Sequence, residues 1–138
     1  MNQKALDLQA RTRRFATAVI RFCETLPANA AVAKIADQLL DSASSTDSNY
    51  RAACRARSPN EFIAKIGVAV EEADESEGWL QLLVEADFVT LDKARDLLRE
   101  ADELTAIFVA SRKTAERRQS AREATQKRMA ASARRRSS

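Results

Sequence analysis

The sequence predicts an all-α protein, an antiparallel up-down-up-down four-helix bundle followed by a basic, partly disordered C-terminal tail. Glycine and proline, which interrupt helices, occur only twice each in 138 residues, whereas Ala, Leu, Arg and Glu are abundant. Apolar residues recur at alternating spacings of three and four along four segments, which is the spacing of one helix face. The connections between these segments are short, so we expect neighbours in sequence to pack antiparallel.

The first two helices are separated by a proline. The first stripe comprises Ala5, Leu8, Thr12, Phe15, Val19, Phe22 and Leu26. Pro27 ends this helix, because the residue before a proline disfavours α geometry. Asn29 is a suitable N-cap for the second helix, whose stripe runs straight through a hydroxyl-rich segment, residues 42–48. That stripe comprises Val32, Ala36, Leu39, Ala43, Thr46, Tyr50 and Ala53.

The third helix has the clearest start in the chain. Ser58 can cap it, Pro59 suits its first position, and Glu61 can complete a capping box. Its stripe comprises Phe62, Ile66, Ala69, Ala73, Ser76, Leu80 and Leu83.

The fourth helix is expected to begin after Thr90, which can act as its N-cap. Its stripe comprises Ala94, Leu97, Ala101, Leu104, Phe108, Ser111 and Ala115. Beyond about Arg118 the apolar period fades, so residues 119–138 cannot bury enough apolar surface to become ordered on their own. We therefore divide the chain into a bundle, residues 1–118, and a basic tail, residues 119–138, that we expect to be a frayed helix followed by disorder.

A second face of the second helix carries only small residues. Its members are Ser42, Ser45, Asn49 and Ala52, beside the main stripe. Such a face lets another backbone approach closely, and its hydroxyls can bond back to helical carbonyls. We predict that it packs against another helix, and we take it as a candidate oligomer interface. The alternative is a solvated face, because serine is common on protein surfaces.

Two segments of the sequence resemble those of a known protein family. They are "RTRRFATAVIRFCETLP" and "QLLDSASSTDSNYRAACRARSPNEFIAKIGVAVEEADESEGWLQLL", of which "NYRAACRARSPNEFIAKI" is the most specific. Over roughly residues 8–115 the chain resembles the bacterial four-helix-bundle proteins encoded by intervening sequences inside 23S ribosomal RNA genes. It departs from their pattern at Asp41, where a basic residue is usual, and at Gly78, where a bulky or aromatic residue is usual.

That family is distantly similar to the accessory variability determinant of diversity-generating retroelements. The latter is a homopentameric four-helix bundle that binds nucleic acid and a reverse transcriptase. The resemblance therefore implies a pentamer with small residues where protomers meet.

Positive charge is concentrated at one end of the predicted bundle and in the tail. Residues 112–138 hold ten Lys and Arg and two Glu, a net charge of +8, whereas the rest of the chain is at −5. With helices alternating in direction, the following residues meet at one end, which we call the basic end: Arg11, Arg13, Arg14, Arg51, Arg55, Arg57, Arg112, Lys113, Arg117 and Arg118. Repeated around an oligomer, they would attract phosphate backbones by counterion release. The alternative is a tail that only aids solubility.

Catalytic chemistry has little support. The absence of histidine excludes Ser-His and Cys-His pairs and the Glu-x-x-His ligands of di-iron bundles. Five acids between Glu71 and Glu77 have no visible nucleophile beside them, so we expect them to form ion pairs, for example Glu77 with Arg99. We expect Trp79 to pack in the core or at a protomer interface rather than to stack on a ligand. Cys23 and Cys54 lack CxxC spacing, which favours reduced thiols, and we expect no metal or cofactor.

These features predict a non-enzymatic, homo-oligomeric scaffold with general affinity for RNA or DNA, and the family resemblance implies that the oligomer is a pentamer. The chain has no secretion signal pattern and no apolar run near the 20 or so residues of a membrane span, so we expect it in the cytoplasm and not in a membrane. The alternative function is a protein-interaction adaptor that docks a partner enzyme without binding nucleic acid. A hydrolase or transferase would need an enclosed polar pocket, for example one lined by Glu72, Glu75 and arginine.

Overall fold

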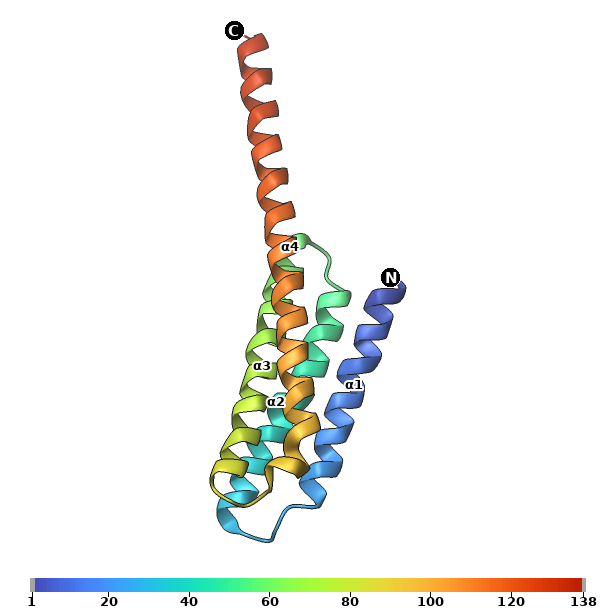
Figure 1. Ribbon diagram of the computed structural model, residues 1–138. Coiled ribbons are helices and arrows are strands. Elements are labelled where there is room, and N and C mark those ends of the chain that lie inside the picture. The colour runs from blue at the N-terminus through green and yellow to red at the C-terminus, as the bar shows by residue number, and fades with distance from the viewer. Residues whose placement is uncertain (1, 138) are drawn as a thin grey trace.

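The computed structural model describes residues 2–137, which form four helices and no strand. The helices are α1 (Gln3–Glu24), α2 (Ala30–Cys54), α3 (Pro59–Glu85) and α4 (Leu91–Ser137). Consecutive helices run in opposite directions (Figure 1), and each helix packs against the next one. The prediction of an all-α helical bundle is confirmed.

The helices begin where the sequence indicates. The Asn29 side chain accepts hydrogen bonds from the N–H groups of Ala31 and Val32, and Thr90 Oγ1 accepts one from the N–H of Lys93 at 3.3 Å. The Ser58 hydroxyl likewise accepts from the N–H of Glu61 at 3.1 Å. These contacts satisfy N–H groups that have no partner within a helix. The three predicted N-caps are therefore confirmed.

A Schellman turn closes α3. Asp87 adopts a positive φ of 63°, the N–H of Phe88 donates to the carbonyl of Leu83 at 3.1 Å, and the N–H of Asp87 donates to that of Val84 at 3.0 Å. Aspartate tolerates this left-handed conformation better than most residues, although glycine is the usual choice. The turn reverses the chain within a few residues, so α4 returns antiparallel along α3.

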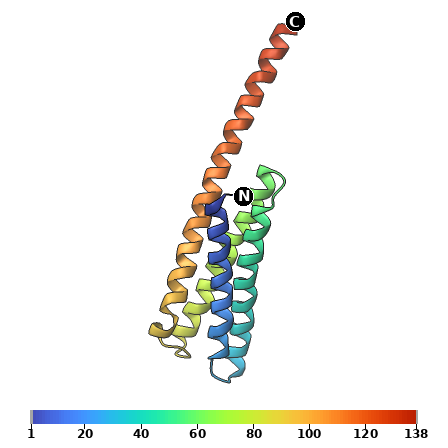
Figure 2. The same cartoon turned by 90° about the vertical axis from the view of Figure 1, so that its right-hand side faces the viewer.

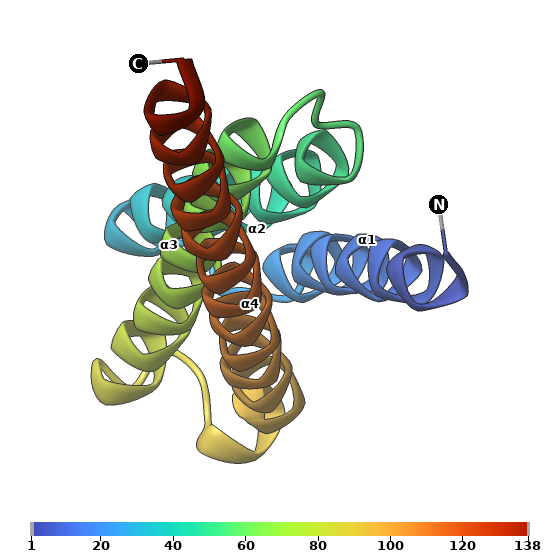
Figure 3. The same ribbon diagram turned by 90° about the horizontal axis from the view of Figure 1, so that it is seen from above.

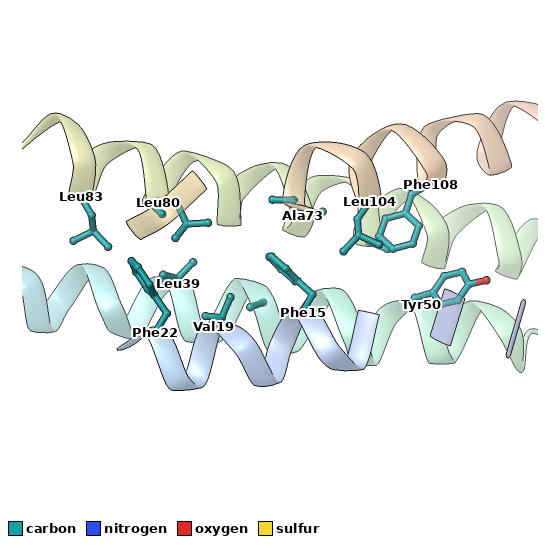
Figure 4. Packing of buried hydrophobic residues seen from close by; sticks show 14 of the residues in the cluster. Phe15, Val19, Phe22, Leu39, Tyr50, Ala73, Leu80, Leu83, Leu104 and Phe108 are labelled. Atoms are coloured by element: carbon teal, nitrogen blue, oxygen red, sulfur yellow. The ribbon is translucent and has the colours of Figure 1, made fainter. Parts of the chain in front are cut away.

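The predicted stripes meet in one core. α2 packs between α1 and α3, and α4 packs against α3 and more sparsely against α1. Alanines on the facing surfaces of α3 and α4, including Ala69, Ala73, Ala94 and Ala101, are fully buried and let the two backbones come close. Larger side chains fill the centre, and Figure 4 shows them pointing inward from all four helices. The largest of these are Phe15, Leu39, Ile66, Leu80, Leu83, Leu104 and Phe108.

The last part of α4 corrects the sequence prediction. Residues 119–137 continue the helix to Ser137 instead of fraying into disorder. Figures 1 and 2 show this segment standing clear of the other three helices. Two physical facts explain why this segment stays helical although it buries little apolar surface. Ala, Arg, Gln and Glu are strong helix formers, and a helix that is already nucleated grows without paying the nucleation cost again.

Candidate nucleic-acid interface

The residues of the basic end belong to α1, the end of α2, the turn after it, and α4. Three of them form ion pairs with acidic residues of the same chain. Arg11 donates from Nε and Nη2 to both carboxylate oxygens of Glu100, at 2.8 and 2.6 Å, and Nη2 also contacts Glu103. The hydrogen bonds to Glu100 raise the pKa of Arg11 above its usual range. Because Glu100 and Glu103 lie on α4, Arg11 ties α1 to α4, and its charge is already neutralised.

Arg13 also forms an ion pair within the chain. Its Nε and Nη2 donate to Asp47 Oδ2 of α2, at 3.0 and 2.9 Å, and the Asp47 residue is only 7% exposed. The second oxygen of Asp47 has no hydrogen-bond partner in the described chain. Arg13 is therefore the cation that makes burial of this carboxylate tolerable.

Arg112 forms the third internal ion pair, with Glu116 one turn later at 3.4 Å, and its side chain lies beside Gly67 of α3.

The other seven residues of the basic end form no ion pair within the described chain. They are Arg14, Arg51, Arg55, Arg57, Lys113, Arg117 and Arg118, of which all but the half-buried Arg51 are exposed. These seven cations are free to meet an anionic partner.

The projecting part of α4 carries additional positive charge. From the sequence, we expected these charges to lie in a disordered tail. We call residues 119–137 the cationic extension. Its basic residues are Arg122, Lys127, Arg128, Arg134, Arg135 and Arg136, against the single acid Glu123. The extension is about 28 Å long at 1.5 Å per residue. Its basic residues are spread around the helix rather than along one stripe, because their spacing does not follow the helical repeat.

One member of the small-residue face of α2, Ser42, contacts α3. Ser42 is 2% exposed, and the Ser76 hydroxyl donates to its oxygen across the interface at 2.8 Å. The Ser42 hydroxyl itself donates back to the carbonyl of Leu39 at 3.1 Å. Ser45, Asn49 and Ala52 are half-buried. The close approach at Ser42 is thus made within the monomer, and a role of this face between protomers stays a prediction.

The acidic segment of α3 lies on the outer surface. Burial raises the pKa of Glu72, and the nearby charges of Glu75, Glu71 and Asp41 raise it further. Trp79 is half-buried, and its Nε1 donates to Glu75 at 3.3 Å. Within residues 2–137, no group of three or more His, Cys, Asp or Glu side chains is placed to hold a metal ion.

The predicted pair between Glu77 and Arg99 is wrong. Arg99 contacts Asp96 of its own helix at 3.8 Å, whereas Glu77 accepts a hydrogen bond from Gln81 at 3.3 Å. Burial raises the pKa of Glu77, and the carboxylate of Asp102 on α4 adds to the shift. Antiparallel packing thus brings an acid of α4, not a base, next to Glu77.

The two cysteines are free and half-buried. Burial, with a smaller effect of the Asp37 carboxylate, raises the pKa of Cys23 to about 11. Its thiol is therefore a weak nucleophile at neutral pH. None of the helices in the described chain combines the length and apolarity needed to cross a membrane.

A groove of about 1110 Å³ opens beside the basic end. One wall is the N-terminal part of α1, and the other is α4 from Ile107 to Arg118. The end of α2 and the start of α3 close its base. This groove could not be predicted from the sequence, because it depends on how α1 is inclined to the other helices, which no periodicity reports.

Comparison with known proteins places the fold in a family. The sequence model for "23S rRNA-intervening sequence protein" matches residues 4–110. The chain belongs to this family. A crystal structure from Bacteroides thetaiotaomicron, described as a protein of unknown function from the S23 ribosomal protein family, superimposes with a TM-score of 0.74 at 25% identity. The match covers 80% of the present chain and 99% of the other. Among curated proteins, none matches this chain.

The family match agrees with the resemblance carried by the segments around Arg11 and Tyr50. It ends at residue 110, so the cationic extension lies beyond the matched region. The more distant resemblance to the retroelement protein is not among these findings and stays a hypothesis.

Proposed function

We propose that this member of the family is a non-enzymatic, homo-oligomeric scaffold of the cytoplasm that binds the phosphate backbone of nucleic acid. One observation supports this most strongly. The cationic extension is a continuous helix that projects from the bundle, carries six bases and one acid, and packs against no other helix along most of its length.

The geometry suits a backbone contact better than base-specific recognition. A free helix about 28 Å long is comparable to one turn of duplex, about 34 Å. Arginine and lysine around such a helix can reach phosphates on both sides of a groove. No aromatic residue lies in the extension, so the stacking platforms typical of sequence-tolerant single-strand binders are missing there. The proposal is therefore general affinity for duplexes.

Self-assembly would multiply this affinity, because linked sites bind one duplex with a raised effective concentration. The pentamer is implied by the family resemblance, and the half-buried residues Ser45, Asn49 and Ala52 are the candidate contacts between protomers.

Light scattering after size exclusion, at 50 mM and 500 mM salt, tests both parts of the proposal. We expect an assembly near five times 15.3 kDa, and a gain in mass on adding a 20-base-pair DNA or RNA duplex only at the lower salt. A 15.3 kDa monomer that does not respond to either duplex would contradict the proposal.

A second candidate function is an adaptor that docks a partner protein. The groove between α1 and α4 favours it, because apolar surface is left open there.

A further inference from the structure

The groove is a part of the bundle core that the chain does not fill. α1 diverges from the other helices toward its N-terminus (Figure 3). Its stripe is buried from Thr12 to Phe22, but the preceding stripe members Ala5 and Leu8 are only half-buried. On the opposite wall, Ser111 and Ala115 of α4 are half-buried as well. The packed four-helix core therefore ends before it reaches these residues, although the stripes of α1 and α4 extend as far as them.

A stacked aromatic pair forms the last complete layer under the groove. The rings of Tyr50 and Phe108 lie 5.2 Å apart at an interplanar angle of 23°. Phe108 is fully buried, whereas Tyr50 lines the groove. Burial raises the pKa of Tyr50 above its usual range, and a hydrogen bond with Cys54 adds to the shift. The floor of the groove is thus apolar, with a neutral phenol at its edge.

The floor and the rim differ in chemistry. Apolar side chains on the floor and walls are Leu8, Ala53, Phe62, Ile107 and Ala110. The rim carries the cations Lys4, Arg57 and Arg118, none of which is ion-paired in the described chain, and the single acid Asp7. The groove therefore suits a ligand that is apolar on one side and negatively charged at its flanks.

The walls set the length of that ligand. They run over residues 2–11 of α1 and 107–118 of α4, about 14 to 16 Å at 1.5 Å per residue. Three turns of an α-helix have the same length. A helix lying there would continue the packing of the bundle, with its apolar stripe on the half-buried residues of both walls.

We propose that this groove binds an amphipathic helix with acidic flanks from another protein. A folded second copy is a poorer occupant, because outside the groove most of the apolar stripe residues of α1 to α4 are already buried in their own core, and the large exposed apolar side chains of the described chain are divided among α1, α3 and α4. Nucleic acid is also a poorer occupant, because its sugar-phosphate backbone gains nothing from an apolar floor. This proposal does not depend on nucleic-acid binding.

The probe is a fluorescein-labelled 14-residue peptide of Leu, Ala and Glu, with Leu along one helical face and Glu on both sides of it. A matched peptide carries Lys in place of Glu. We expect the full-length protein to bind the Glu peptide at least tenfold more tightly than the Lys peptide, measured by fluorescence anisotropy. Ala110→Trp, which places an indole in the groove, should weaken Glu-peptide binding at least tenfold. Ala33→Trp, on the exposed surface of α2 at the far end, should not.

The same variants separate the possible occupants. Ala110→Trp should leave both duplex binding and the mass of the assembly unchanged. Equal binding of the Glu peptide to Ala110→Trp and to the unaltered protein, or no binding at 1 mM peptide, would overturn the proposal. If Ala110→Trp breaks up the assembly, the groove is an interface between copies. If it lowers duplex affinity, the groove is a nucleic-acid site. Either result would also overturn the assignment to a partner helix. Circular dichroism establishes that the variant is helical.

Discussion

Replacing five bases of the cationic extension by glutamine should lower affinity for a 20-base-pair duplex by at least about a hundredfold at 50 mM salt, since each lost phosphate contact removes a counterion-release contribution. The five are Arg122, Lys127, Arg128, Arg134 and Arg136. Glutamine is nearly as good a helix former as arginine and lysine, so α4 should keep its length. Fluorescence anisotropy with labelled duplex measures the change.

A matched control separates the position of the charge from its amount. It replaces five exposed bases at the opposite end of the bundle by glutamine, namely Arg21, Lys34, Lys93, Arg95 and Arg99. Both variants change the net charge by the same amount. We expect the control to lose less than about tenfold in affinity, because its bases lie far from the extension and screening at 50 mM salt limits their reach to about 14 Å. Equal losses in the two variants would show that only net charge matters.

Phe108→Ala should destabilise the bundle by about 3 to 5 kcal/mol, the usual cost of removing a fully buried phenylalanine. Phe108 is 0% exposed and stacks on Tyr50, so its loss leaves a cavity in the last complete core layer and removes an aromatic contact. Urea unfolding followed by circular dichroism measures the free energy of unfolding.

The comparison for this experiment is Leu6→Ala on α1. Leu6 is 45% exposed, so its truncation should cost less than about 1 kcal/mol. If Phe108→Ala were as mild as Leu6→Ala, the stacking of Phe108 on Tyr50 and its packing in the core would be looser than the structure indicates.

The fold follows from signals that are local in sequence. The caps at Asn29, Ser58 and Thr90 and the four apolar stripes depend only on residues within one or two turns of each other. For this reason they could be predicted, and residues such as Val19 and Leu80 are indeed fully buried.

The remaining features depend on how helices are placed in three dimensions. From the sequence, Arg11 and Arg13 were predicted to be free cations of the basic end. Only the packing of α1 against α4 and α2 shows that Glu100 neutralises Arg11 and that Asp47 neutralises Arg13. The groove requires the inclination of α1, which no periodicity encodes. The error in the extension was different in kind. Its residues have high helix propensity, and a helix continued from the bundle does not require a buried face to persist.

The extension and the groove are neighbours, because Arg118 lines the groove and the extension begins at the next residue. A partner helix seated in the groove would therefore lie close to a bound duplex. Such an arrangement would let one molecule bring a protein and a nucleic acid together, as a scaffold requires.

The most direct test of the proposed function is the salt dependence of duplex binding, measured between 50 and 300 mM for the full-length protein and for the five-glutamine variant of the extension. Counterion release predicts a straight line of log affinity against log salt for each, with a slope of about −0.9 for every phosphate contacted. We expect the variant's slope to be shallower by about 3 to 5, one contact for most of the bases removed. Identical slopes, or an affinity that does not fall with salt, would contradict the claim that the cationic extension binds the phosphate backbone.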